Sequence, residues 1–195
     1  MKDVRCSFVV SLCFLCVLWI CLAEMVFPHT STWGIREAVA SPFDAVGESQ
    51  VKKIVHTYDL EGEEWILVRK QDFTLTLYRG RSVIASYPVA IGKNDGDKQK
   101  SKDMRTPEGV FSVLSVENSS HWVHDFGDGK GPIAGAYGPY FIRLKTPYRG
   151  IGIHGTHDPN SIGTKATEGC IRLRNEDLLA LVKDVKKGMI VVILP

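Results

Sequence analysis

Residues 153–173 read IHGTHDPNSIGTKATEGCIRL, so His154 stands sixteen residues before Cys170 and each lies beside a glycine. Between them runs a polar segment rich in Gly, Pro, Asn, Ser and Thr, with apolar residues at both ends. A thiol becomes a strong nucleophile when a neighbouring imidazole takes its proton. A returning loop brings two strand-end residues side by side, and glycine lets backbone N–H groups approach a reacting carbonyl. The stretch therefore predicts a cysteine acyl-transfer site.

The cysteine distribution supports a reactive thiol. Four of the five cysteines fall in the apolar N-terminal run, which leaves Cys170 alone in the rest of the 195-residue chain. An unpaired cysteine in an exported protein is expected to be reactive or to pair between molecules. The ordinary alternative is a small buried side chain, but the adjacent glycine and the upstream histidine favour a nucleophile. The formal net charge is only +2, which gives no footprint for nucleic-acid binding.

The N-terminus has the pattern of a secretory signal. Lys2 and Arg5 precede an almost wholly apolar run from Cys6 to Ala23, and residues 1–23 are therefore predicted to be a signal peptide. The run also reaches the ~18 residues that a membrane-spanning helix needs, so a retained membrane anchor is the alternative. Either way the remainder is expected to work outside the cytoplasm, in the periplasm or cell envelope, touching membrane only through this segment. Residues 24–63 show no long periodic segment and are expected to be a linker or lead-in.

Residues 64–195 are predicted to form one mainly β domain. Phe73 to Tyr78 alternates apolar and polar residues, the period of a half-buried strand. One C-terminal helix is expected after Asn175, which can cap it, and Gly188 is its expected end. The picture is a β-sandwich or barrel with one C-terminal helix. Further strands are expected over residues 83–91, 109–116, 140–144, 151–154 and 189–194.

Four motifs carry a more specific signal than composition or periodicity. They are Ile153-His154-Gly155-Thr156, Gly169-Cys170-Ile171-Arg172-Leu173 sixteen residues on, Arg105-Thr106-Pro107-Glu108-Gly109 and Gly138-Pro139-Tyr140. Together they resemble the L,D-transpeptidase catalytic domain, and the resemblance covers Trp65 to Leu194 and implies the YkuD-like fold. Members are exported enzymes of bacterial peptidoglycan. They cut a tetrapeptide stem after its third residue, usually meso-diaminopimelate, and join that carbonyl to an amine. The implied partners are peptidoglycan stem peptides, and no cofactor is implied.

The resemblance also implies roles for residues of the motifs. Cys170 is the expected nucleophile and His154 its general base, with the Gly155 carbonyl orienting the imidazole as a third triad member does elsewhere. The N–H groups of Gly169 and Cys170 are expected at an oxyanion hole, and Tyr140 is expected to add its hydroxyl. The ordinary alternative for Tyr140 is core packing with the hydroxyl at the rim, which is the more frequent role of a tyrosine.

Glu168 and Arg172, each two positions from Cys170, bear on which substrate the site binds. Arg172 is expected to hold a carboxylate of the stem by a bidentate contact, the alternative being a surface ion pair or internal brace. The family's usual Ser/Thr-His-Gly-Cys is replaced here by Thr167-Glu168-Gly169-Cys170. A close, ionised Glu168 would raise the pKa of the thiol. It could instead point away, pair with a lysine or arginine, or read the substrate's ammonium group.

Other functions fit parts of the sequence. A zinc peptidase would need ligands such as those of His121-x-x-His124 and His154-x-x-His157, but no HExxH helix is present, and no metal is predicted. A degenerate wall-binding module would not need both His154 and Cys170. Within the enzyme hypothesis, a second stem's amine as acceptor gives 3→3 cross-links and is the favoured prediction. Water would give a carboxypeptidase or endopeptidase, and a protein lysine would give attachment of a protein to the wall.

Overall fold

The computed structural model describes residues 42–127, 129 and 131–195. The predicted signal or anchor at residues 1–23 lies outside the described residues, as does the first part of the predicted lead-in. No helix in the described part is long and apolar enough to cross a membrane. The elements are α1 (Pro42–Thr57), β1 (Glu64–Arg69), β2 (Thr74–Arg79), β3 (Ser82–Pro88), β4 (Ile91–Gly92), β5 (Gly109–Asn118), β6 (Val123–His124), β7 (Ile133–Ala134), β8 (Tyr140–Lys145), β9 (Gly152–His154), η1 (Pro159–Ser161), β10 (Lys165–Thr167), β11 (Ile171–Arg172), α2 (Asn175–Leu181) and β12 (Ile190–Leu194).

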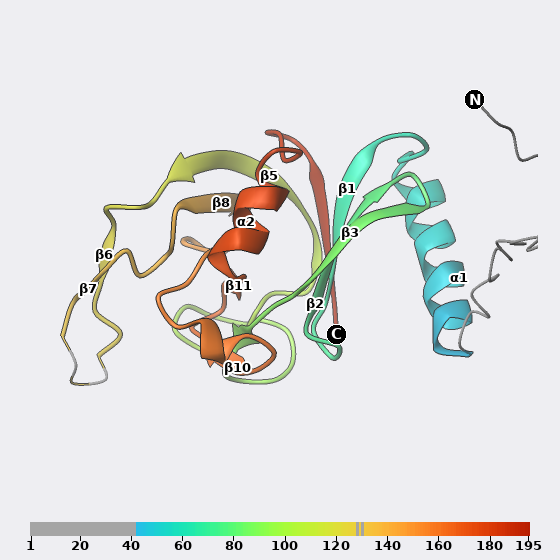
Figure 1. Ribbon diagram of the computed structural model, residues 1–195. Coiled ribbons are helices and arrows are strands. Elements are labelled where there is room, and N and C mark those ends of the chain that lie inside the picture. Colours follow the sequence, from blue (N-terminus) through green and yellow to red (C-terminus); the bar gives the residue numbers. More distant parts are fainter. Residues whose placement is uncertain (1–41, 128, 130) are drawn as a thin grey trace, which may run out of the picture. The chain divides into compact units, whose positions relative to one another are not determined.

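Eight strands form one sheet in the order β11-β9-β8-β5-β12-β1-β2-β3 (Figure 1). The pairs β1–β12 and β9–β11 are parallel, and the other neighbours are antiparallel. The long strand β5 arches from β12 across to β8, so the sheet curls on itself (Figure 1). Two short sheets, β4–β10 and β6–β7, complete the β structure. The prediction of a mainly β fold is confirmed.

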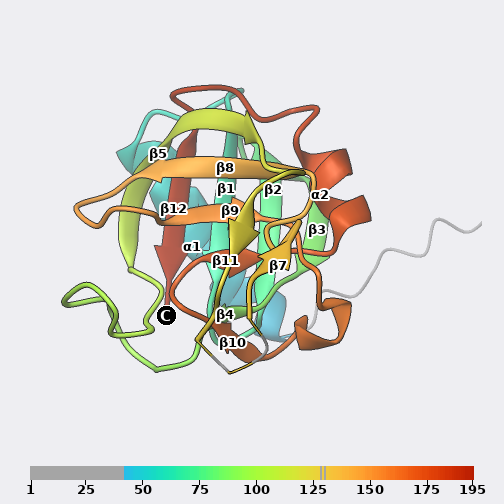
Figure 2. The ribbon, with the colours of Figure 1, turned by 90° about the vertical axis from the view of Figure 1, so that its left-hand side faces the viewer.

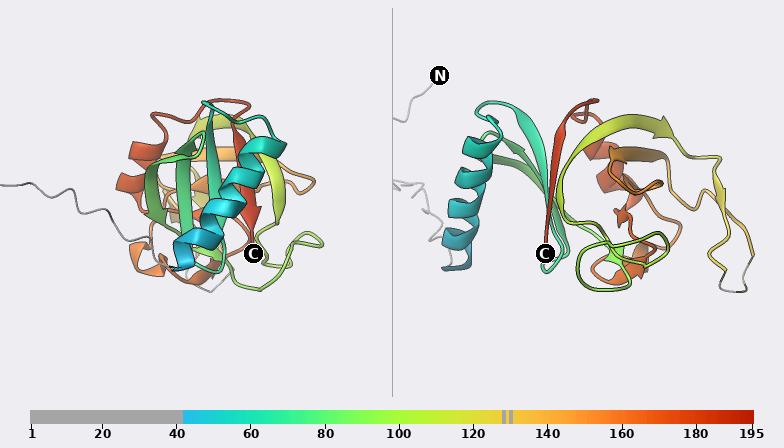
Figure 3. Two further views of the ribbon diagram at one scale, coloured as in Figure 1. Left: turned by 90° about the vertical axis from the view of Figure 1, so that its right-hand side faces the viewer. Right: turned by 180° about the vertical axis from the view of Figure 1, so that it is seen from behind.

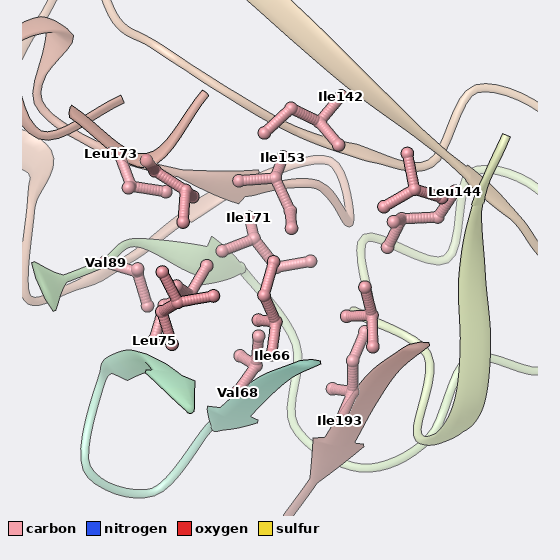
Figure 4. Close-up of a cluster of buried hydrophobic side chains, with 14 of the residues drawn as sticks. Ile66, Val68, Leu75, Val89, Ile142, Leu144, Ile153, Ile171, Leu173 and Ile193 are labelled. Atoms are coloured by element: carbon pink, nitrogen blue, oxygen red, sulfur yellow. The ribbon is translucent and has the colours of Figure 1, made fainter. Parts of the chain in front are cut away.

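The main core fills the inside of the curled sheet. Ile142, Ile153 and Ile171 come from the adjacent strands β8, β9 and β11 and have no exposed surface (Figure 4). Burying an aliphatic side chain of this size contributes about 1.5–3 kcal/mol to stability. Successive side chains of a strand point to opposite faces. The inward isoleucines therefore turn the neighbouring residues of β9 and β11 away from the core.

Helix α1 corrects two expectations, a single helix and a linker through residue 63. Val51, Ile54 and Val55 recur at helical spacing and are buried together with Trp65 and Leu67 of β1. The helix packs on the outer face of β12, β1 and β2 (Figure 3), so β1 is buried on both faces. These apolar positions stand among polar and charged residues such as Lys52 and Lys53, so the helix was not predicted from periodicity. Helix α2 also ends earlier than predicted, at Leu181.

Trp65→Ala should lower the free energy of unfolding by about 3–5 kcal/mol, the usual cost of removing a fully buried tryptophan. Trp65 is 0% exposed, stacks on Tyr78 at 4.7 Å between ring centroids, and donates its indole N–H to the Gly80 carbonyl at 2.8 Å. Guanidinium unfolding followed by circular dichroism measures the change. The control Leu179→Ala removes a side chain that is 46% exposed and should change the value by no more than ~0.5 kcal/mol. Equal effects of the two changes would contradict the packing of α1 on the sheet through Trp65.

Candidate active site

The two parallel strands β9 and β11 bring His154 and Cys170 to one place. Arg172 pairs with His154 and Ile171 with Ile153, and Cys170 directly precedes β11. Because side chains alternate along a strand, His154, Cys170 and Arg172 share the face opposite the two buried isoleucines. All three line one cavity of about 570 Å³. The spacing of sixteen residues is thus the length of the crossover that parallel pairing requires.

Polar side chains inside the crossover hold its shape. The Thr156 hydroxyl accepts the Asp158 N–H at 2.8 Å, and the Ser161 hydroxyl donates to the Asp158 carbonyl at 2.7 Å. Arg172 then donates from Nη1 to the Ser161 Oγ at 2.9 Å. These local bonds satisfy backbone groups that would otherwise need a ladder partner. They explain why a Thr-, Asn- and Ser-rich segment returns to the site instead of extending.

The His154 ring is fixed by a backbone carbonyl and two aromatic rings. Its Nδ1 lies 2.6 Å from the Gly155 carbonyl oxygen. A carbonyl can only accept, so Nδ1 carries the proton and Nε2 is left as the basic nitrogen. The ring stacks on Phe141, with centroids 5.5 Å apart and planes 6° apart, and meets the Tyr137 ring edge-on at 4.9 Å. Burial lowers the pKa of His154 to about 3, so the imidazole is neutral near pH 7.

The Cys170 thiol is also uncharged at rest. Its S–H donates to the Gly150 carbonyl at 3.2 Å, and the residue is half-buried. Burial raises the pKa of Cys170 to about 11, opposed by the N–H of Gly152 and reinforced by the charge of Glu168. The cavity is therefore lined by a neutral thiol and a neutral imidazole.

Two of the residues expected at an oxyanion hole lie differently from the prediction. Gly169 has a φ of 129°, and a Cβ there would lie 2.6 Å from the Arg105 carbonyl oxygen, so only glycine fits. Its N–H donates to Thr167 Oγ1 at 3.1 Å, which engages this donor within the loop. Tyr140 packs against the hydrophobic core and is absent from the cavity wall, whereas Tyr137, three residues earlier in the same motif, lines the cavity.

Arg172 is a buried cation near Cys170. It is 4% exposed, its Nε has no hydrogen-bond partner, and it forms no ion pair with the described residues. Burial lowers the pKa of Arg172, yet a guanidinium is still charged near neutral pH. A cation in such surroundings favours a carboxylate partner within the cavity.

Glu168 connects the loop that carries Cys170 to residues 124–127 of the cavity wall. One of its carboxylate oxygens lies 3.5 Å from Nε2 of His124 in β6. Figure 2 shows β6 and β7 in front of the sheet, on the side of β9 and β11, and residues 124–127 line the cavity. Glu168 thus pairs with a histidine, a partner that the sequence analysis did not consider.

The histidines considered as zinc ligands do not converge. In the part of the chain that the structure describes, no three His, Cys, Asp or Glu side chains are grouped so as to hold a metal ion.

Asn175, predicted to cap α2, instead bonds to the backbone of Thr156. No signal in the sequence pointed to this contact, since it joins residues nineteen positions apart.

Glu168→Gln should lower the pKa of Cys170, because it removes a negative charge that disfavours the thiolate. At any pH below about 11 the variant then holds more thiolate, and iodoacetamide should alkylate it faster, by up to roughly 10-fold for a shift of one pKa unit. Alkylation rates across pH 7–10 measure this. The control Asp125→Asn removes another carboxylate of the cavity wall while keeping an acceptor for the Gly127 N–H, and its rate should match the wild type. Equal rates for wild type and Glu168→Gln would rule out the electrostatic effect of Glu168.

This chain is similar to known proteins in sequence and in fold. Residues 63–193 match the family described as YkuD, L,D-transpeptidase catalytic domain. The chain is 32% identical over 122 residues to YkuD of Bacillus licheniformis, covering 63% of this chain and 60% of that relative. It is 32% identical over 136 residues to YqjB of Bacillus subtilis, covering 69% and 73% respectively. Both relatives carry L,D-transpeptidase in their names.

A solved structure supports the fold. The catalytic domain of an L,D-transpeptidase from E. faecium superposes with a TM-score of 0.51 at 22% identity, covering 68% of this chain and 98% of that one. At this identity the similarity shows a common fold. The family match is broader evidence, because it spans residues 63–193 and includes both His154 and Cys170. The chain therefore belongs to the YkuD family of L,D-transpeptidase catalytic domains.

Proposed function

We propose that this chain is an L,D-transpeptidase of the cell envelope that acts on peptidoglycan through an acyl-enzyme on Cys170. One observation carries the proposal: His154 is anchored through Nδ1 to the Gly155 carbonyl, and His154 and Cys170 line the same cavity. This is the arrangement of an activated nucleophile, a base oriented by a third group. The donor is a tetrapeptide stem, cut between its third residue and the terminal D-Ala.

The first half of the reaction transfers the stem to the enzyme. Nε2 of His154 takes the proton of the Cys170 thiol as the sulfur attacks the carbonyl of the third stem residue. The bond to D-Ala then breaks, and the imidazolium returns the proton to the departing amine. A thioester on Cys170 results. Because both groups are neutral at rest, charge develops only during the attack, where general-base catalysis acts.

The second half releases the stem onto an acceptor. The side-chain amine of a second stem attacks the thioester and loses its proton through His154, which restores the thiol and yields a 3→3 cross-link. Water or a protein lysine would resolve the same thioester by the same path, giving a tripeptide or a wall-attached protein. The product therefore depends on whether a stem amine, water or a protein lysine reaches the thioester first.

Tyr137 is the side-chain donor that we assign to the developing oxyanion. Burial raises the pKa of Tyr137 to about 12, so its hydroxyl keeps its proton near pH 7. It lines the cavity and meets the His154 ring edge-on. A neutral O–H preorganised in a partly buried site stabilises charge that appears on a carbonyl oxygen. The N–H of Cys170 is the backbone donor of this proposal.

Arg172 is the residue that we assign to the terminal carboxylate of D-Ala. Its guanidinium is buried beside Cys170, has an unpartnered Nε, and is held in place from Nη1 by Ser161. An arginine so fixed presents a fork that matches a carboxylate. Bound there, the D-Ala carboxylate places the preceding amide bond near the thiol.

The location of the enzyme follows from the N-terminal pattern. Lys2 and Arg5 precede the apolar run that ends at Ala23, which supports export by a secretory signal. The proposal thus places the catalytic domain in the periplasm or cell envelope, where stem peptides are found. The apolar run would then be either the cleaved signal or a retained anchor.

Cys170→Ser should form no acyl-enzyme, because an alcohol is hardly ionised near neutral pH and is a weaker nucleophile than a thiol. Intact-protein mass spectrometry after incubation with a tetrapeptide muropeptide measures the adduct. The wild type should gain the mass of the stem without its terminal D-Ala, and the variant should gain nothing. A variant that still releases D-Ala at the wild-type rate would contradict the role of Cys170.

Tyr137→Phe should lower the rate of acylation by about 10²–10³-fold, the usual effect of removing one oxyanion donor. Tyr140→Phe is the matched control, because Tyr140 lies outside the cavity wall, and its acylation rate should equal that of the wild type. Single-turnover kinetics with a tetrapeptide stem measures both. A slow Tyr140→Phe beside an unaffected Tyr137→Phe would reverse the assignment of the two tyrosines.

A further inference from the structure

The side chain of Asn175 forms two hydrogen bonds with Thr156, in the loop that follows β9. Its Oδ1 accepts the N–H of Thr156 at 2.8 Å, and its Nδ2 donates to the carbonyl of Thr156 at 3.0 Å. Asn175 is the first residue of α2, and Thr156 lies two residues after His154. The helix that follows the nucleophile is thereby joined to the loop that follows the base.

The first of these bonds acts on the peptide group that orients His154. The Gly155 carbonyl and the Thr156 N–H belong to the same planar unit. Its carbonyl end accepts the proton of His154 Nδ1 at 2.6 Å, and its N–H end donates to Asn175 Oδ1 at 2.8 Å. Because the unit is rigid, a partner that fixes the N–H also fixes the direction of the carbonyl.

Two glycines pack closely against the Asn175 amide. A Cβ on Gly155 would lie 2.2 Å from Asn175 Oδ1, and a Cβ on Gly138 would lie 2.3 Å from the same atom. Gly138 also has a φ of 67°, which L side chains rarely adopt. Two glycines therefore make room for the Asn175 amide, which is consistent with a site built around that amide.

We propose that Asn175 is a positioning residue for catalysis: it holds the Gly155–Thr156 peptide so that the Gly155 carbonyl keeps the proton on Nδ1 of His154 and directs Nε2 to the thiol. The inference rests on the proposed function, in which Nε2 is the base. A hydrogen bond donated by the N–H end also strengthens the carbonyl at the other end as an acceptor. Asn175 itself touches no reacting atom.

Asn175→Ala and Asn175→Asp test the proposal, with Glu176→Ala as the control in the next, exposed position of the same helix. Asn175→Ala removes both bonds and should lower the single-turnover acylation rate by about 10²-fold, the usual cost of misplacing a catalytic group by about 1 Å. Asn175→Asp keeps the acceptor but loses the donor, and should lower the rate by about 10-fold, between wild type and Ala. The KM for the stem should stay within about 3-fold in both, because substrate contacts are unchanged.

A spectroscopic readout separates positioning from general stability. In the wild type the Nδ1–H proton of His154 should give a downfield proton NMR signal, because it is held in a short hydrogen bond to a carbonyl. The signal should be lost or move upfield in Asn175→Ala and persist in Glu176→Ala, at temperatures well below each variant's Tm. A folded Asn175→Ala with the wild-type signal and acylation rate would overturn the proposal. So would failure of both Asn175 variants to fold, which would make Asn175 a folding residue.

This NMR signal needs no substrate. If the wild type fails to react with stem peptides while Asn175→Ala loses the signal, the proposed function fails and the positioning role of Asn175 stands. If the wild type reacts and Asn175→Ala matches it in rate and signal, the positioning role fails and the proposed function stands.

Discussion

The parallel pairing of β9 with β11 is the constraint on which the site depends. It sets His154 opposite Arg172 and places Cys170 at the adjoining strand end. Ile153 and Ile171 anchor the two strands in the core. Their burial orients the opposite face, which carries His154, Cys170 and Arg172. Gly152 contributes by its lack of a side chain, because a Cβ there would lie 2.3 Å from the Phe141 ring, which stacks on His154.

The electrostatics of the site follow from that burial. Moving a charge out of water is costly, and the buried imidazole and the half-buried thiol are both held in their neutral forms. Arg172 is the buried exception, a cation beside Cys170 whose Nε has no partner in the described structure. The resting site thus holds a neutral imidazole, a neutral thiol and a fixed cation, which is the starting state that the proposed mechanism requires.

Local sequence signals predicted much of this structure, and tertiary contacts explain the rest. The alternation of apolar and polar residues predicted strands, and the spacing of the motifs predicted that His154 and Cys170 lie close together. Both signals are local, because strand period and loop length are properties of a short stretch. Helix α1 was not predicted, because its stability depends on packing against β1. The choice between Tyr137 and Tyr140 depends on which of them faces the cavity, and the contact of Asn175 joins segments distant in sequence. No local pattern encodes either.

Transfer of an acyl group from a stem peptide through a thioester can be measured by mass spectrometry of the products from purified tetrapeptide muropeptides. We expect cross-linked dimers that lack one D-Ala, formed by the purified protein without any added cofactor. Tripeptide alone would keep the acyl-enzyme and make water the acceptor in that reaction. Muropeptides that keep every D-Ala, with no adduct on the protein, would contradict an acyl-transfer function of this site.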